Sequence, residues 1–213
     1  MTMDPAQAAK NTAEKLVIGL SGASGVAYGI RLLEALKELR IESHLVMSKP
    51  AQLTIGYETD LTPKQVAAKA DHVHPIDDIA APIASGSFKT RGMIVAPCSV
   101  RTMSEIATGV TTNLLTRAAD VMLKERRPLI LMVRETPLHL GHLRTMTALA
   151  EMGAIILPPM PAFYAEPKTL SDLVDQMAGR ALDLLGYTWP MKRWGEDLPS
   201  SHSRNGAKRK KRT

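Results

Sequence analysis

The chain has 213 residues, of which 45% are hydrophobic, and this length favours one domain with a well-filled core. The formal net charge is +6, but one acid-free segment at residues 204–212 carries six positive charges, which leaves a nearly neutral body. A body of this kind with 4% aromatic residues lacks the basic face and the stacking platforms of dedicated nucleic-acid-binding proteins. We therefore expect no specific nucleic acid partner.

The single cysteine and the distribution of apolar residues indicate the cellular compartment of the protein. Cys98 has no second cysteine with which to form a disulfide, which is typical of a reducing compartment. The amino-terminal residues lack the apolar stretch of a signal peptide, and no apolar run approaches the roughly 20 residues that span a bilayer. We expect a cytoplasmic protein with a flexible segment at 1–14, one domain at 15–198 and a disordered basic tail at 199–213. The tail is interpreted as a solvated end, with weak attraction to nucleic acid or an anionic membrane as the alternative.

Short apolar runs alternate with longer amphipathic stretches along the chain, as in parallel strands joined by crossover helices. Strands are expected at residues 16–20, 43–47, 92–96, 129–133 and 154–157. Helices are expected at residues 30–39, directly after Pro97, and at 113–125, 140–152 and 169–185. This order predicts an α/β fold with a three-layer, doubly wound parallel sheet of flavodoxin-like or Rossmann-like type.

Prolines mark two expected strand ends, because proline cannot donate to a sheet ladder. We expect the second strand to leave the sheet between Ser48 and Pro50, and Pro97 to end the third strand. Residues 59–88 show no clear period and are expected to hold a short helix and a connecting loop.

The first strand is followed by a glycine loop, Gly22-Ala23-Ser24-Gly25. Ligands of open parallel sheets bind beyond the carboxyl ends of the strands, and a glycine loop before a helix can turn backbone N–H groups toward a phosphate. The spacing of Gly22, Gly25 and Gly29 is not that of the dinucleotide fingerprint, and the lysine of a P-loop is absent, so neither NAD nor ATP is favoured. A tight turn that binds nothing remains the alternative.

A second hydroxyl-rich turn follows the third strand. Ser99 and Thr102 stand where a helix begins, and they can cap that helix or hold a phosphate. Cys98 is interpreted as a core residue, because no histidine is placed near it in sequence.

Several cations are candidates for a second anion site, since guanidinium groups bind phosphate oxygens through two hydrogen bonds. They are Arg117, Lys124, Arg134 and Arg180. For each one alone, a solvated salt bridge is the alternative. His139 and His142 have the spacing of a metal pair but lack a third ligand, and His72 and His74 are given no role. We expect no metal.

Taken together, a set of longer motifs resembles one family, that of the UbiX flavin prenyltransferases. The motifs are Gly22-Ala23-Ser24-Gly25, Ser48-Lys49, Glu58-Thr59, Pro97-Cys98-Ser99, Asn113 to Asp120, Lys124 to Pro128, Arg134 to Pro137 and Pro161 to Tyr164. The resemblance covers residues 15–194. It implies metal-free transfer of a dimethylallyl group from dimethylallyl monophosphate to reduced FMN, which makes prenylated FMN for a separate UbiD-type decarboxylase of aromatic or unsaturated acids, including those of ubiquinone biosynthesis. The family also implies a homo-oligomer, a dodecamer, with sites between subunits.

The resemblance assigns roles residue by residue. It implies that FMN is bound by Gly22, Ala23, Ser24, Ser48, Ser99, Val100, Arg101, Thr102 and Arg134. It implies that the prenyl donor is bound by Arg117, Lys124, Tyr164, Arg180 and Trp194. The catalytic residues that it implies are Ser24, Glu58, Lys124 and Glu135. Cations that hold the departing phosphate suit this chemistry, because breaking the allylic carbon–oxygen bond builds negative charge there.

Two departures from the family pattern and two alternative functions accompany this assignment. Ile79 stands where some members carry an aromatic residue, so Trp194 serves alone as a wall of the allyl pocket, and Pro50 replaces a small residue after Ser48-Lys49. One alternative is a flavin-dependent peptidyl-cysteine decarboxylase, but the histidine that such enzymes carry on an early helical segment is missing. The other is a non-catalytic flavin carrier, which would not need a second phosphate site.

Overall fold

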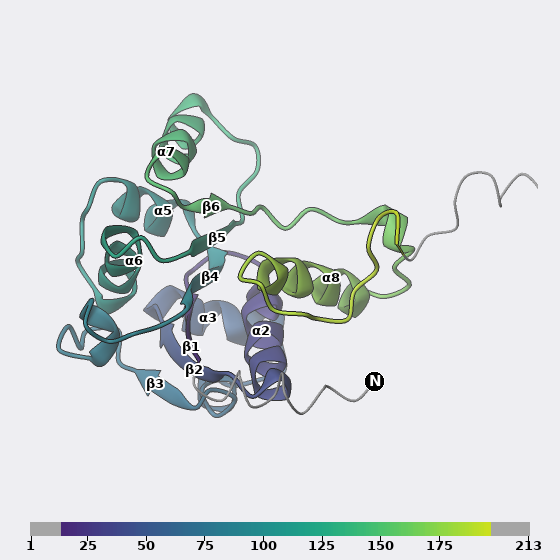
Figure 1. Cartoon of the computed structure of the whole chain (residues 1–213), viewed down its shortest axis with the longest axis horizontal. Coiled ribbons are helices and arrows are strands. Elements are labelled where there is room, and N and C mark those ends of the chain that lie inside the picture. Colours follow the sequence, from purple (N-terminus) through teal and green to yellow (C-terminus); the bar gives the residue numbers. More distant parts are fainter. Residues whose placement is uncertain (1–13, 197–213) are drawn as a thin grey trace, which may run out of the picture. The chain divides into compact units, whose positions relative to one another are not determined.

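The computed structural model describes residues 14–196, and the chain divides into two compact units at Pro159 and Met160 (Figure 1). The expected flexible segment at 1–14 and the basic tail at 199–213 lie almost entirely outside the described residues. The single domain at 15–198 stays a prediction. Within the described part, no helix has the length and apolar character needed to cross a membrane.

The first unit is built on a six-stranded parallel sheet with the order β3-β2-β1-β4-β5-β6. The strands are β1 (Lys15–Leu20), β2 (Glu42–Met47), β3 (His72–His74), β4 (Gly92–Cys98), β5 (Leu129–Val133) and β6 (Ile155–Ile156). This is the strand order of the Rossmann fold, and it confirms the doubly wound parallel α/β fold. The order reverses between β1 and β4, and the carboxyl edge at that point is where such sheets bind ligands.

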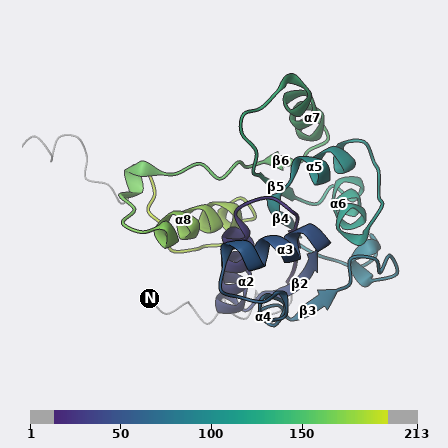
Figure 2. The ribbon, with the colours of Figure 1, turned by 180° about the vertical axis from the view of Figure 1, so that it is seen from behind.

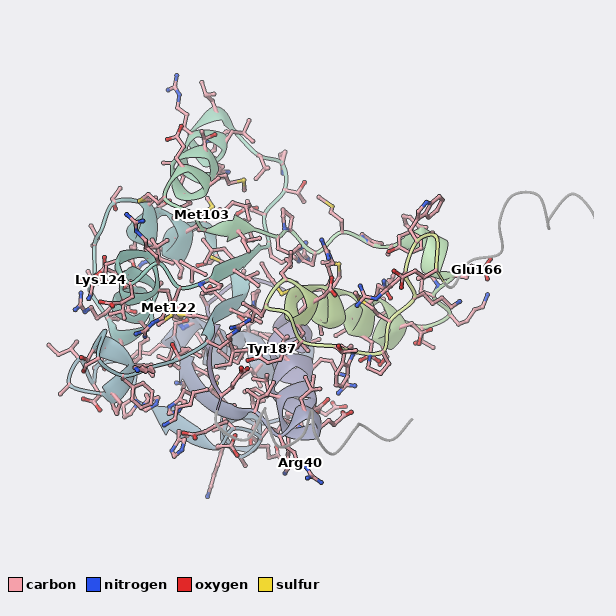
Figure 3. All side chains as sticks on the ribbon, in the orientation of Figure 1. Arg40, Met103, Met122, Lys124, Glu166 and Tyr187 are labelled. Atoms are coloured by element: carbon pink, nitrogen blue, oxygen red, sulfur yellow. The ribbon has the colours of Figure 1, made fainter. Side chains whose placement is uncertain are left out.

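Helices cover both faces of the sheet. On one face α2 (Val26–Leu39) packs against β1, β2 and β4, and α3 (Lys49–Glu58) and α4 (Pro63–Ala67) follow β2 beside it (Figure 2). On the other face α5 (Val100–Ala107) and α6 (Leu114–Lys124) close a core that includes Met103 and Met122 (Figure 3). The helix α7 (Leu140–Glu151) then leads into β6. The predicted three layers are therefore present in this unit.

One glycine sets how closely α2 approaches the sheet. A Cβ atom at Gly29 would lie 2.3 Å from the Ala96 carbonyl oxygen of β4 and 3.1 Å from the Leu20 side chain. We expect Gly29→Ala to lower the free energy of unfolding by about 1–3 kcal/mol, because a backbone carbonyl cannot move aside as a flexible side chain can. Urea denaturation measures this effect.

The matched control is Gly56→Ala in α3, where a Cβ atom would meet nothing within 4 Å. Alanine has a higher helix propensity than glycine, so Gly56→Ala should raise the free energy of unfolding by up to about 1 kcal/mol. Equal stabilities for the two variants would contradict the close contact between α2 and β4.

The structure differs from the sequence-based expectations at two prolines. β4 does not end before Pro97 but continues to Cys98, because the ladder with β5 is irregular between Val95 and Cys98 and the missing N–H is not needed there. Pro50 lies in the first turn of α3, a helix that was not expected; proline is tolerated there, since first-turn N–H groups have no partner within the helix.

The second unit is described from Met160 to Glu196 and contains the short 3₁₀ helix η2 (Phe163–Ala165) and the helix α8 (Leu170–Asp183). Thr169 caps α8 by accepting from the Asp172 N–H, and Asp172 accepts from Thr169 in return. The segment after α8 folds back on it, since a Cβ atom at Gly179 would lie 2.7 Å from Trp189. The expected helix at 169–185 is thus confirmed with slightly shorter bounds.

Candidate functional site

The loops that follow β1 and β4 are joined at the carboxyl edge by one buried side chain, Ser21. Its hydroxyl donates to the Pro97 carbonyl at 2.9 Å and accepts from the Ser99 N–H at 2.7 Å, and the Ser21 N–H donates to Pro97 as well. This hydroxyl is fully buried. Ser21 therefore fixes the glycine loop against the Ser99 turn at the point where the strand order reverses. The sequence indicated a small polar residue after β1 but not this bridge.

We expect Ser21→Ala to lower the free energy of unfolding by about 1–3 kcal/mol, because the change leaves the partly buried Ser99 N–H without its acceptor. Urea denaturation of the flavin-free protein measures the loss. Ser24→Ala, at an exposed position of the same loop, is the control and should change stability by less than about 0.5 kcal/mol. A Ser21 variant as stable as the Ser24 variant would show that the bridge contributes nothing.

The glycine loop is shaped by two close approaches. A Cβ atom at Gly22 would lie 2.2 Å from the Pro50 side chain, so the loop and the start of α3 touch. Gly25, the residue before α2, has φ of 102°, a conformation that glycine adopts without strain. A Cβ atom at Gly25 would lie 3.6 Å from Arg134 Nε, which places that guanidinium beside the loop.

Glu58 occupies the amino terminus of α2. Its Oε2 accepts hydrogen bonds from the Gly25 N–H at 2.8 Å and the Val26 N–H at 3.0 Å, while the Ala23 N–H donates to the Ser21 carbonyl. The Glu58 carboxylate thus takes two of the backbone N–H groups that were expected to bind an anion. A carboxylate suits this position, because the amino terminus of a helix is its positive end. The N–H groups of Gly22 and Ser24 have no partner among residues 14–196. This capping role of Glu58 was missed by the sequence reasoning; its proposed role in proton handling stays a prediction.

The serines that follow β2 and β4 both cap helices. Ser48 Oγ accepts from the Ala51 N–H at the start of α3, and Ser99 Oγ accepts from the Thr102 N–H at the start of α5. Val100 begins α5, so these turns bring three helix amino termini, those of α2, α3 and α5, to one edge of the sheet. A helix amino terminus favours negative charge. The local capping expected of Ser99 is therefore present, and the edge also remains suited to an anion.

Arg134 brings a cation to the same edge. Its backbone N–H donates to the Cys98 carbonyl at 3.1 Å, which fixes the residue next to the Ser99 turn. Its side chain is exposed and forms no ion pair with any other residue in 14–196. Arg101, by contrast, is paired with Glu105 at 2.9 Å on the surface of α5. Glu135 is exposed and accepts from the neighbouring Thr136 N–H.

Lys124 lies away from this edge within one chain, and Arg117 is bonded to other groups. Lys124 is the last residue of α6, pairs with Glu125 beside Gly86, and precedes the first residue of β5 by five positions (Figure 3). Arg134 follows the end of β5, so the length of a five-residue strand, about 17 Å, separates the two edges. Arg117 donates to the Ala84 carbonyl and to Asp120. The single chain does not bring Lys124 to the glycine loop.

The remaining candidates belong to the second unit. Tyr164 and Trp194 form an edge-to-face pair with ring centroids 5.4 Å apart. Arg180 is half exposed and pairs with Asp183, which also accepts from Arg193 at 2.7 Å. The hydrogen bond from Arg193 lowers the pKa of the Asp183 carboxyl, and the contact with Arg180 lowers it further. This unit therefore presents an aromatic pair and an exposed guanidinium.

Comparison with known proteins decides which family has this site. The chain matches the protein family described as Flavoprotein over residues 5–182. It is 56% identical over 178 residues to "Flavin prenyltransferase UbiX" of Escherichia coli K12, an alignment that covers 83% of this chain and 94% of that one. The chain belongs to the UbiX family.

Two solved UbiX structures resemble the whole fold. One is AnUbiX (PadA1) in complex with FMN and dimethylallyl pyrophosphate, with a TM-score of 0.82 and 49% identity over 85% of this chain and 98% of that one. The other is a dodecameric FMN-dependent UbiX-like decarboxylase from Escherichia coli O157:H7, with a TM-score of 0.83 and 49% identity over 84% and 98%. The resemblance of the motifs to the UbiX family is thereby confirmed.

Cys98 is a packing residue in this UbiX-family chain. The side chain is fully buried, and burial raises the pKa of its thiol to about 12, which leaves almost no thiolate at neutral pH. His139 accepts from the Gly141 N–H at the start of α7 and stacks on His142 at 3.6 Å between ring centroids. His139 thus caps α7, and the absence of a metal at this pair stays a prediction.

Proposed function

We propose that the protein transfers a dimethylallyl group from dimethylallyl monophosphate to reduced FMN, yielding prenylated FMN for a UbiD-type decarboxylase. The observation that carries the proposal is 56% identity to a named flavin prenyltransferase over nearly its whole length, in a chain whose carboxyl edge joins the glycine loop, the Ser99 turn and Arg134. Neither alternative is favoured: the relatives are named prenyltransferases, not cysteine decarboxylases, and a carrier needs no cation for a second phosphate.

The residues at the carboxyl edge fit a flavin phosphate. The N–H groups of Gly22 and Ser24, the amino termini of α3 and α5 and the exposed Arg134 guanidinium offer donors and positive potential at one edge of the sheet. The absence of a Cβ atom at Gly22 lets Pro50 at the start of α3 lie directly against the loop. Ser24 is exposed in the same loop, where its hydroxyl can hydrogen-bond the reacting edge of the ring.

Bound reduced FMN supplies the electron pair that takes up the prenyl group. The chain's own residues act on the donor: as the allylic carbon–oxygen bond breaks, the electron pair leaves with phosphate, and Arg180, Lys124 and Tyr164 hold the growing negative charge. Tyr164 and Trp194 offer aromatic faces to the allyl fragment, which carries the positive charge. Glu58 and Glu135 are proposed to move the proton that ring closure releases.

This assignment needs more than one copy of the chain. Lys124 and Arg134 lie at opposite edges of the same sheet, so a phosphate held by Lys124 can meet a flavin beside Arg134 only if the two residues come from different subunits. A dodecamer of the kind solved for the Escherichia coli O157:H7 relative satisfies that requirement. We propose that this chain forms the same assembly.

The decisive assay mixes purified protein anaerobically with reduced FMN in excess over protein and with dimethylallyl monophosphate. We expect the flavin pool to become heavier by one prenyl unit over many turnovers, with equimolar release of phosphate. Folded protein that binds FMN but leaves its mass unchanged would exclude the transferase and favour a carrier. Parallel reactions with the diphosphate determine which donor is used.

A further inference from the structure

Four ligand-type side chains gather on one face of the sheet, away from the flavin edge. Glu42 and His44 are two residues apart in the first half of β2. His72 and His74 are two residues apart in β3, the edge strand of the sheet (Figure 1). His44 and His72 are register partners in this parallel pair. Side chains two residues apart share a face, so the four point to the same side.

The distances within this cluster suit a metal ion. Glu42 Oε1 lies 3.0 Å from His44 Nε2 and 3.2 Å from His72 Nε2, and the three ligand atoms all lie within 4.8 Å of one another. Ligand atoms bound at about 2.1 Å in a tetrahedral site stand about 3.4 Å apart. To aim its Nε2 lone pair at an ion shared with His44, His72 must turn out of its stack with the His44 ring, and its side chain is 53% exposed.

His44 is held in the orientation that a ligand needs. Its ring is nearly fully buried, its Nδ1 is hydrogen-bonded to His74 Nε2 at 2.9 Å, and the edge of Phe88 packs against it at 5.1 Å between centroids. Its Nε2 therefore points at Glu42, and the His72 ring stacks on the His44 ring with 4.7 Å between centroids. Metal-binding imidazoles commonly use one nitrogen for the ion and hydrogen-bond the other, which fixes the ring.

We propose that Glu42 Oε1, His44 Nε2 and His72 Nε2 bind one divalent transition-metal ion, with Zn²⁺ as the reference ion, and that His74 positions His44. Two imidazoles and a carboxylate are a ligand set that zinc accepts, and solvent beside the half-exposed His72 provides the fourth ligand. The ion would join β2 to its edge neighbour β3. The site takes no part in prenyl transfer, because it lies at the start of β2, whereas Ser48 follows that strand's end.

Lys15 is the built-in competitor of the metal. Its ammonium group lies 3.4 Å from Glu42 Oε1 and 4.6 Å from the centroid of the Phe88 ring. A bound cation must overcome repulsion from this charge and displace its contact with Glu42. Removing the ammonium group should therefore tighten metal binding, a result that loss of a merely structural contact would not produce.

The test titrates Zn²⁺ into chelator-treated and dialysed full-length protein against a chromophoric chelator. We expect one high-affinity Zn²⁺ per chain, at least about tenfold weaker binding in His72→Gln, and at least about threefold tighter binding in Lys15→Met. Removal of the exposed His72 imidazole does not disturb the core, and circular dichroism verifies the fold of each variant. Thermal unfolding gives an independent readout, since Zn²⁺ should raise the Tm of the unaltered protein but not of His72→Gln.

The matched control is His142→Gln, which removes a histidine from α7 and should leave zinc affinity unchanged. The proposal is overturned if the unaltered protein binds no Zn²⁺ in this range, if His72→Gln binds it as tightly, or if His142→Gln loses affinity equally. Glu42→Gln gives a further check. Loss of the carboxylate must weaken Zn²⁺ binding at the site, and any Zn²⁺ bound by other histidines of the chain must stay unchanged in amount.

Discussion

Arg180→Ala should lower the rate of prenyl transfer by about 10²–10³-fold while leaving the affinity for FMN within about twofold of the unaltered protein. The reason is that a guanidinium aimed at the departing phosphate stabilises charge that exists only in the transition state. Arg180 is suited to this role because it is half exposed and its ion-pair partner, Asp183, is shared with a second arginine. Single-turnover mass spectrometry of the flavin and fluorescence titration of FMN measure the two quantities separately.

The matched control is Arg193→Ala. Arg193 and Arg180 contact different oxygens of the Asp183 carboxylate, so removing either one disturbs the same local network. Only Arg180 is proposed to hold phosphate. An equal loss of turnover in the two variants would mean that the effect is structural and passes through Asp183. A parallel loss of FMN binding in Arg180→Ala would mean that the arginine belongs to the flavin site instead.

The central strands and covering helices could be predicted because burial dictates their composition. The run at 129–133 is entirely apolar, and β5 has those bounds because both of its faces are covered. The predicted helix at 113–125 agrees with α6 to within one residue at each end, since Asn113 caps it and its apolar residues recur at helical spacing.

The outermost strand of the sheet, β3, could not be predicted in the same way. β3 has three residues, pairs with β2 alone and exposes Val73, so it has neither an apolar run nor a buried face that would reveal it. The sequence signal for β3 was the spacing of its histidines: His72 and His74 are two residues apart, as are Glu42 and His44 in β2. The short β6, partly exposed, was expected at 154–157 because those residues form an apolar run, and the structure limits the strand to Ile155–Ile156.

The candidate site was predictable by residue but not by contact. Small and polar residues after strands pointed to Ser24, Ser99 and Arg134, and all three are at the carboxyl edge. The roles of Ser21 and Glu58 could not be inferred, because both depend on contacts between segments distant in sequence, 78 residues apart for Ser21 and Ser99. The predicted strand at 129–133 lies between Lys124 and Arg134, so their placement at opposite edges could be inferred from the sequence.

The second large effect is expected for Arg134→Ala, which should weaken FMN binding by about 10–100-fold, the loss typical of one hydrogen-bonded charge. Arg134 is held beside the glycine loop by its backbone bond to Cys98, and no other residue in 14–196 neutralises its charge. Turnover at saturating FMN should fall far less than in Arg180→Ala, because Arg134 binds the FMN phosphate equally in the ground and transition states. Fluorescence titration at several salt concentrations measures the affinity.

Two control variants separate site charge from overall charge. Lys64→Ala removes one positive charge from the exposed surface of α4 and should leave FMN affinity unchanged. Arg101→Ala removes a cation already paired with Glu105, and because that carboxylate offsets its charge we expect a smaller loss than for Arg134→Ala. If Arg101→Ala and Arg134→Ala weaken binding equally, the phosphate lies over the start of α5 and not between α2 and Arg134. Unchanged affinity in Arg134→Ala would remove the cation from the flavin site altogether.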